Sequence, residues 1–253
     1  MSNTTSKSET YLFVHGCWNG KWCWDLASNL LQRRGHKVHS ITLPGCAEYN
    51  AQATRDTNLS VHVQSVIDYI TTNDLKDITL LGHSYGGVVI SGVADQCASR
   101  IKTLVFIDSW VCVEGQSCTD LIPPEFKQQF IDKANAYSPA GCLLPFPGIF
   151  FFGLTDKVIV SYAEAMCTPH PLFTLLEPVH YKNGGYNAVA KKFYIECTTT
   201  WDAYPLLEVA KKNARDNNFE FLSIECTHCP HLEKPVEFVN LLGDIANKVN
   251  GTA

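Results

Sequence analysis

The chain has 253 residues, of which 45% are hydrophobic and 18% are charged, and its formal net charge is −5. This composition predicts a single globular domain over residues 1–253 and excludes an intrinsically disordered chain. The absence of long charge runs argues against a nucleic acid or a membrane surface as partner, and no apolar run approaches the roughly 18 residues of a membrane span. No secretory signal is recognisable at the start, so we expect a cytoplasmic protein.

Short runs of β-branched and aromatic residues alternate with helical patterns along the chain. These runs predict strands at 11–14, 37–42, 78–81, 102–107, 192–195 and 219–224. Helices are predicted at 22–34, 60–72, 85–98, 205–214 and 234–248. Nearly continuous apolar strands that alternate with helices indicate an α/β fold with a doubly wound, mostly parallel sheet.

One interval breaks this alternation. Between Ile107 and Lys192 the chain is far longer than one crossover requires, and its aromatic content argues against disorder. We therefore predict that residues 111–190 form a cap inserted over one end of the sheet. The run of Phe150, Phe151 and Phe152 either fills the core of this cap or contacts a substrate.

Eleven cysteines are scattered from Cys17 to Cys229. Their odd number and the expected reducing compartment favour small buried side chains over disulfides. The stretch 226–231 holds two cysteines and two histidines, but adjacent side chains converge poorly on a tetrahedron. We therefore expect neither a metal nor another cofactor.

The stretch Gly82–Gly86 reads Gly-His-Ser-Tyr-Gly and lies between a predicted strand and a predicted helix. It fits the pattern G-x-S-x-G, in which a serine nucleophile occupies a sharp strand-to-helix turn and the glycines leave room for it. Dinucleotide-binding and phosphate-loop patterns do not fit the same glycines. The sequence therefore predicts that Ser84 is a nucleophile.

A serine hydroxyl needs a base to take its proton, so a histidine must lie within reach. The candidates after Ser84 are His170, His180, His228 and His231, and only the last two follow the final predicted strand. The stretch from His228 to Pro235 resembles the histidine loop of many α/β-hydrolases, where the catalytic histidine precedes a helix-starting proline by seven residues. This resemblance selects His228 and leaves His231 to pack beside the loop.

The resemblance extends over nearly the whole chain. Residues 14–24, Val-His-Gly-Cys-Trp-Asn-Gly-Lys-Trp-Cys-Trp, are similar to the opening of the plant methylesterase and hydroxynitrile lyase group and of its bacterial esterase relatives. The stretches 82–87 and 168–171 are similar to the bacterial members. The resemblance implies an oxyanion hole made by the backbone N–H groups of Cys17 and Tyr85, and two such donors suit a tetrahedral intermediate. His15 and His83 are expected to hold loops.

The acid of the expected triad has two candidates. Plant members carry it after the strand that corresponds to 192–197, but counting back from Pro205 puts Thr200 there, and the nearest carboxylate is Asp202. Asp108 directly follows the strand at 102–107, and some hydrolases of this fold take their acid from that place. We favour Asp108 because a carboxylate has no packing reason to follow an apolar strand, and Asp202 stays the alternative.

These residues predict a serine hydrolase, a carboxylesterase that works through an acyl-enzyme intermediate. The aromatic residues predict a small to medium hydrophobic ester, aromatic esters included, as the small-molecule partner, with Trp18, Trp110 and Phe150 as its contacts. Two alternatives stay open: a lyase that cleaves cyanohydrins, and a ligand-binding protein with little turnover. The lyase is disfavoured because Cys229 follows His228, where no lysine stands. The sequence also leaves a homodimer open.

Overall fold

The structure, a computed structural model, describes residues 8–199 and 204–252. Its centre is a six-stranded sheet in which all neighbouring strands run parallel. The strands lie in the order β2 (Lys37–Ile41), β1 (Thr10–Val14), β3 (Ile78–His83), β4 (Ile101–Ile107), β7 (Lys192–Cys197) and β8 (Glu220–Ile224). The predicted doubly wound, parallel sheet is confirmed.

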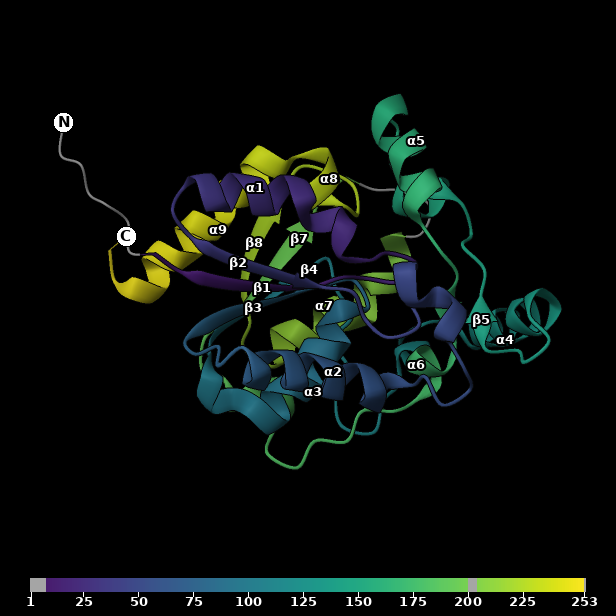
Figure 1. The fold of residues 1–253 in the computed structure, drawn as a ribbon. Coiled ribbons are helices and arrows are strands. Elements are labelled where there is room, and N and C mark those ends of the chain that lie inside the picture. Colours follow the sequence, from purple (N-terminus) through teal and green to yellow (C-terminus); the bar gives the residue numbers. More distant parts are fainter. Residues whose placement is uncertain (1–7, 200–203, 253) are drawn as a thin grey trace.

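Helices cover both faces of the sheet (Figure 1). On one face α1 (Asp25–Arg33) packs beside α9 (Pro235–Asn250), and on the other α2 (Leu59–Thr72) packs beside α3 (Gly86–Cys97). The remaining predicted helix, at 205–214, corresponds to α7 (Glu208–Asp216). Local sequence fixes the helix ends: the Asn58 side chain accepts the Val61 N–H at the start of α2, and Gly251 ends α9 with φ +69°.

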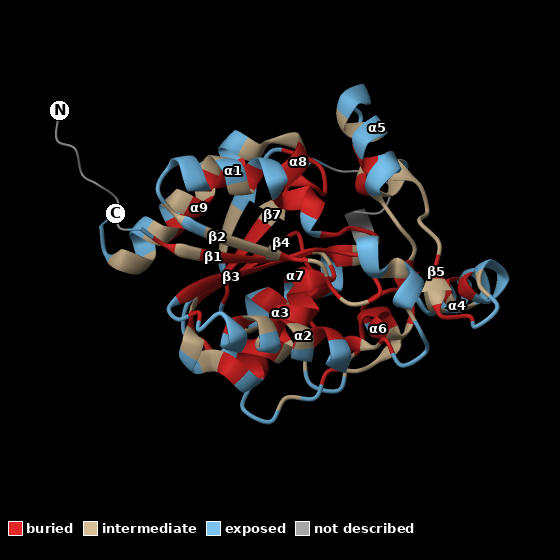
Figure 2. Ribbon diagram, viewed as in Figure 1, coloured by how far each residue is buried: buried red, intermediate tan, exposed pale blue. Residues whose placement is uncertain are grey.

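The centre of the sheet is the best-covered part of the fold (Figure 2). Every residue of β3 is buried, as is every residue of β4 except Lys102, which forms an ion pair with Glu9. Truncating a buried aromatic residue here, such as Phe106, would destabilise the fold by about 3–5 kcal/mol. β3 and β4 therefore form a rigid platform, and Ser84 and Asp108 are the first residues beyond their carboxyl ends.

Residues 111–190 lie between β4 and β7, and we call them the inserted segment. Residues 124–176 gather near the carboxyl ends of the strands (Figure 1), whereas residues 182–188 pack against α3 on the way to β7. The longer helices of the inserted segment are α4 (Pro124–Tyr137) and α5 (Lys157–Met166), and β5 (Leu143–Leu144) pairs antiparallel with β6 (His170–Pro171). Its short helical turns are η4 (Cys118–Leu121), η5 (Ile149–Phe152), α6 (Phe173–Leu176) and η6 (Gly185–Ala188). Sequence patterns assigned no elements to this segment.

The remaining short elements connect the sheet and its helices. They are η1 (Lys21–Trp24), η2 (Ala47–Gln52), η3 (Ala98–Arg100), η7 (Tyr204–Leu207) and α8 (Pro230–Glu233). Within residues 8–199 and 204–252, none of the helices is both long enough and apolar enough to cross a membrane.

Candidate active site

Ser84 lies in the tight turn between β3 and α3. Its φ is +52°, in the left-handed region that a serine rarely adopts, and its N–H donates to Ile107 O at 3.1 Å. A Cβ added to Gly82 would lie 2.5 Å from the Gly86 carbonyl, and one added to Gly86 would lie 2.5 Å from Val14 O. Both glycines are therefore required by close backbone contacts, as the sequence pattern predicted.

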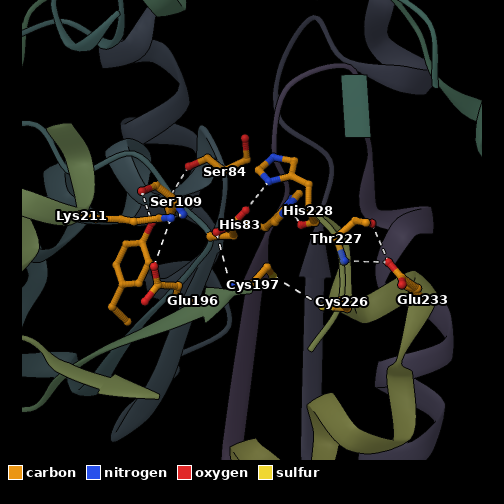
Figure 3. A network of polar contacts seen from close by, with 12 residues as sticks. His83, Ser84, Ser109, Glu196, Cys197, Lys211, Cys226, Thr227, His228 and Glu233 are labelled. Atoms are coloured by element: carbon orange, nitrogen blue, oxygen red, sulfur yellow. Dashed lines mark hydrogen bonds and ion pairs between the residues drawn. The ribbon is translucent and has the colours of Figure 1, made fainter. Parts of the chain in front are cut away.

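His228 lies between β8 and α8, and its imidazole is in direct contact with Asp108. The distance from His228 Nδ1 to Asp108 Oδ2 is 2.7 Å, and Asp108 is fully buried. Because an ionised carboxylate only accepts hydrogen bonds, the proton on the neutral imidazole is on Nδ1, which leaves Nε2 as the acceptor. Figure 3 shows the Ser84 side chain beside this imidazole.

Asp108 is held by the strands around it. Its φ is +40°, its N–H donates to Ile195 O at 2.8 Å, and its Oδ1 accepts the Cys197 N–H at 3.4 Å. Both partners belong to β7, so this neighbouring strand fixes the carboxylate. The alternative acid, Asp202, lies outside the described residues.

The other histidines that follow Ser84 lie apart from this contact. His170 is buried and its Nε2 lies 2.9 Å from Thr174 Oγ1, whereas His180 is at the surface beside Glu114. His231 is buried against Trp24, with ring centroids 4.3 Å apart, and burial lowers its pKa to about 3. Among the four candidates, His228 is the one that contacts a buried carboxylate within residues 8–199 and 204–252.

The loop after β1 lies against Ser84 and carries Cys17. A Cβ on Gly16 would come 2.8 Å from Ser84 Cβ, so only glycine allows this approach. His15 Nδ1 donates to Gly16 O at 2.8 Å, and its Nε2 accepts the Leu43 N–H at 3.0 Å. Burial lowers the pKa of His15 to about 4, so the imidazole stays neutral and can make both bonds.

Tyr85 is the residue before α3 and is fully buried. Its hydroxyl lies 2.9 Å from His62 Nδ1, and His62 Nε2 donates to Pro44 O at 2.7 Å. The tyrosine side chain is therefore engaged within the protein core.

His83 connects the nucleophile turn to the loop of His228. Its Nε2 donates to the His228 carbonyl oxygen at 2.8 Å, and the two rings lie 4.6 Å apart. Burial holds the pKa of His83 well below its ordinary value, so the ring is neutral. This contact is the loop-holding role that the sequence predicted for His83.

Aromatic side chains of the inserted segment lie over the site. Trp18, with φ +64°, has its ring centroid 5.1 Å from that of Phe151, and its Nε1 donates to Leu144 O at 3.3 Å. Phe152 lies 6.0 Å from the His228 ring, and its carbonyl oxygen accepts the His228 N–H at 3.3 Å. Sequence reasoning missed Phe152 as a site residue, because a run of three phenylalanines does not reveal which ring faces inward.

The other two predicted substrate contacts differ in exposure. Trp110 is buried, and its backbone N–H donates to Ser84 O at 3.2 Å. Phe150 is 64% exposed, whereas Phe152 is only 2% exposed. Neither observation tests substrate contact, so both assignments stay predictions.

All eleven cysteines are free thiols, and ten of them are buried. Cys226 Sγ lies 3.6 Å from Cys197 Sγ, and burial raises the pKa of the Cys17 and Cys229 thiols well above the ordinary value. In the part of the chain that the structure describes, no group of three or more His, Cys, Asp or Glu side chains is arranged to hold a metal ion.

Comparisons with known proteins agree with this architecture. A family model described as "Alpha/beta hydrolase family" matches residues 11–241. The "Carbendazim hydrolyzing esterase" of Nocardioides sp. (strain SG-4G) is 31% identical over 239 residues, which cover 92% of this chain and 97% of that protein. The "Putative methylesterase 15, chloroplastic" of Arabidopsis thaliana is 23% identical over 257 residues, and the match spans 95% of this chain but 57% of that protein.

A solved structure gives the same result at the level of the fold. An extracellular alpha/beta-hydrolase from a Paenibacillus species, described as sharing structural and functional homology with tobacco salicylic acid binding protein 2, superimposes with a TM-score of 0.81. The match covers 94% of this chain and 98% of that one at 24% identity. At this identity the likeness concerns the fold alone.

Proposed function

The chain belongs to the alpha/beta hydrolase family, and from this premise we propose that it is a carboxylesterase with Ser84, His228 and Asp108 as its catalytic triad. The observation that carries the proposal is the 2.7 Å contact between His228 Nδ1 and the fully buried carboxylate of Asp108. In further support, one relative is named an esterase and another a putative methylesterase.

The reaction begins when His228 Nε2 takes the proton of the Ser84 hydroxyl, and the serine oxygen attacks the ester carbonyl. The tetrahedral intermediate collapses, the C–O bond to the alcohol breaks, and His228 returns the proton to the departing alcohol. Water, activated by the same imidazole, then attacks the acyl-enzyme and releases the carboxylic acid and Ser84. Asp108 keeps the imidazole in the required tautomer and stabilises its cation in both steps.

The negative oxygen of the intermediate needs preorganised donors. We assign this role to the backbone N–H groups of Cys17 and Tyr85, because the loop after β1 and the start of α3 meet at Ser84. Close contact between Gly16 and Ser84 supports this assignment.

We further propose that the inserted segment acts as a cap and selects a small to medium hydrophobic ester. The support is its aromatic side chains, since Phe151 packs on Trp18 and Phe152 lies beside His228. Apolar walls with few polar groups are typical of sites that bind uncharged ligands. A panel of esters tests this part, and a preference for charged or long-chain esters would contradict it.

The catalytic assignment is tested with a fluorophosphonate probe, which reacts with activated serines. The native protein should be labelled on Ser84 and should hydrolyse p-nitrophenyl acetate, whereas S84A should do neither. Absence of labelling in the folded native protein would favour a ligand-binding protein with little turnover. Cyanide release from mandelonitrile without ester hydrolysis would favour the lyase.

A further inference from the structure

Each proposed oxyanion donor is the N–H of a peptide group whose carbonyl oxygen, on the opposite side of the peptide, accepts a hydrogen bond. In a trans peptide the N–H and the C=O point in opposite directions, so the bonds to the carbonyl fix where the N–H points. The Cys17 N–H shares its peptide with Gly16 O, which His15 holds. The Tyr85 N–H shares its peptide with Ser84 O, which is held by residues that directly follow Asp108.

Among the described residues, three donors reach the carbonyl oxygen of Ser84. Ser109 Oγ donates to it at 2.6 Å, and the N–H groups of Trp110 and Gly87 donate at 3.2 Å each. The Ser109 bond is the shortest of the three, and Figure 3 shows this side chain beside Ser84. A Cβ on Gly87 would lie 1.9 Å from Ser109 Oγ, so the glycine makes room for the hydroxyl.

Ser109 is itself immobilised by a buried tyrosine. Its N–H donates to the Tyr194 hydroxyl at 2.9 Å, and that hydroxyl donates to Ser109 O at 2.9 Å. Tyr194 is fully buried and stacks on Phe221, with ring centroids 4.9 Å apart. The backbone of Ser109 is therefore held by a residue of β7, in the central sheet.

We propose that Ser109 is a positioning residue for the oxyanion hole: its hydroxyl orients and polarises the Ser84–Tyr85 peptide so that the Tyr85 N–H faces the developing oxyanion. The inference rests on the proposed function, since it concerns the same reaction. A hydrogen bond to a peptide carbonyl strengthens the N–H of that peptide as a donor, because the two groups polarise each other. Ser109 contacts no substrate in this role and acts through Ser84 and Tyr85.

The test compares S109A with S91A. Ser91 is also buried and its Oγ donates to a backbone carbonyl, Gly87 O, at 2.7 Å, but it does not contact the Ser84–Tyr85 peptide. Outright loss of an oxyanion donor lowers kcat by about 10²–10³, so a misaligned donor should lower it by about tenfold. For S109A we expect this loss in kcat on p-nitrophenyl acetate with KM unchanged, whereas S91A should match the native protein.

The affinity for an aryl trifluoromethyl ketone distinguishes positioning from a general structural defect. Its adduct with Ser84 places an oxyanion in the hole, so S109A should bind it about tenfold more weakly. S109C, which keeps a weak donor, should fall between S109A and the native protein and serves if S109A fails to fold. Unchanged ketone affinity in S109A, or in S109C where S109A does not fold, would overturn the inference.

Failure of the proposed function is distinguishable from failure of this inference. If the native protein neither hydrolyses esters nor reacts with the fluorophosphonate at Ser84, the proposed function is wrong. If the native protein does both and S109A equals it in kcat and in ketone affinity, the carboxylesterase assignment stands and the role of Ser109 is wrong.

Discussion

The turns at the ends of β3, β4 and β8 differ in construction from the inserted segment above them. The turns hold Ser84, Asp108 and His228 by hydrogen bonds, with Asp108 and His228 buried and with positive φ angles at Ser84 and Asp108. The inserted segment contacts the site through aromatic rings 5–6 Å apart and one backbone hydrogen bond, from the His228 N–H to Phe152 O, and it leaves apolar side chains at the surface, Val158 being 78% exposed. Under the proposed function, the chemistry would be set by a rigid framework, and the choice of substrate by the layer above it.

The largest effect is expected at the acid. D108N should lower kcat by about 10⁴-fold with little change in KM, because an amide no longer fixes the His228 tautomer or stabilises its cation. Steady-state kinetics with p-nitrophenyl acetate measures this. D202N is the matched control, and full turnover in D108N together with loss in D202N would transfer the acid role to Asp202.

Next comes the backbone of the nucleophile turn. G86A should destabilise the protein by about 1–3 kcal/mol, since its Cβ would lie 2.5 Å from a β1 carbonyl that cannot move away. G243A, at an open position in α9, should instead stabilise it by about 0.5–1 kcal/mol. Urea unfolding of both variants is the measurement, and equal stabilities would show that the turn is not rigid.

His231 tests the packing beneath the same framework. Burial lowers its pKa to about 3, whereas in the unfolded chain it is about 6.5, so below pH 6.5 the unfolded state binds a proton that the folded state does not. The stability of the native protein should therefore fall as the pH drops from 6.5 toward 3. Relative to the native protein, H231L should gain about 2 kcal/mol between pH 7.5 and pH 5.

Urea unfolding at the two pH values checks this gain, with H180A as a control at an exposed histidine. Neither ring nitrogen of His231 has a hydrogen-bond partner among the described residues. Replacing the ring with leucine therefore breaks no hydrogen bond and leaves no partner group unsatisfied. An identical pH dependence in H231L and the native protein would contradict the expectation.

The smallest effects should come from the inserted segment. F152L should lower kcat/KM for an aromatic ester by up to about tenfold, because a buried ring beside His228 is replaced by a smaller side chain. F150A should change it less than about twofold, since that ring is mostly exposed. A larger loss in F150A than in F152L would support the predicted role of Phe150 as a substrate contact.

The sheet and the nucleophile turn could be predicted from the sequence because their signals are local. β3 and β4 are short apolar runs buried on both faces, and Ser84 follows β3 within a glycine pattern whose steric reason is visible in the structure. The helices of the inserted segment were not predicted. In α5 only Ala163 is buried, so its apolar residues do not mark one inward face.

The acid and the aromatic contacts depend on distances that a sequence does not contain. Asp108 and His228 are 120 residues apart, and a second carboxylate after another strand fits the chain order equally well. In η5 the chain makes about three residues per turn, so successive phenylalanines point in different directions and only the fold decides which one faces His228.

Asp108 and Ser109 are adjacent residues with different partners. Asp108 contacts the imidazole of His228, and Ser109 donates to the carbonyl oxygen of the Ser84–Tyr85 peptide. In an evolving or engineered lineage either side chain can be exchanged by itself, but a change in the length of this loop disturbs both. We therefore expect insertions and deletions to be tolerated around α4 and α5 and to be excluded from residues 107–110. New substrate ranges would then arise by remodelling the layer above an unchanged loop.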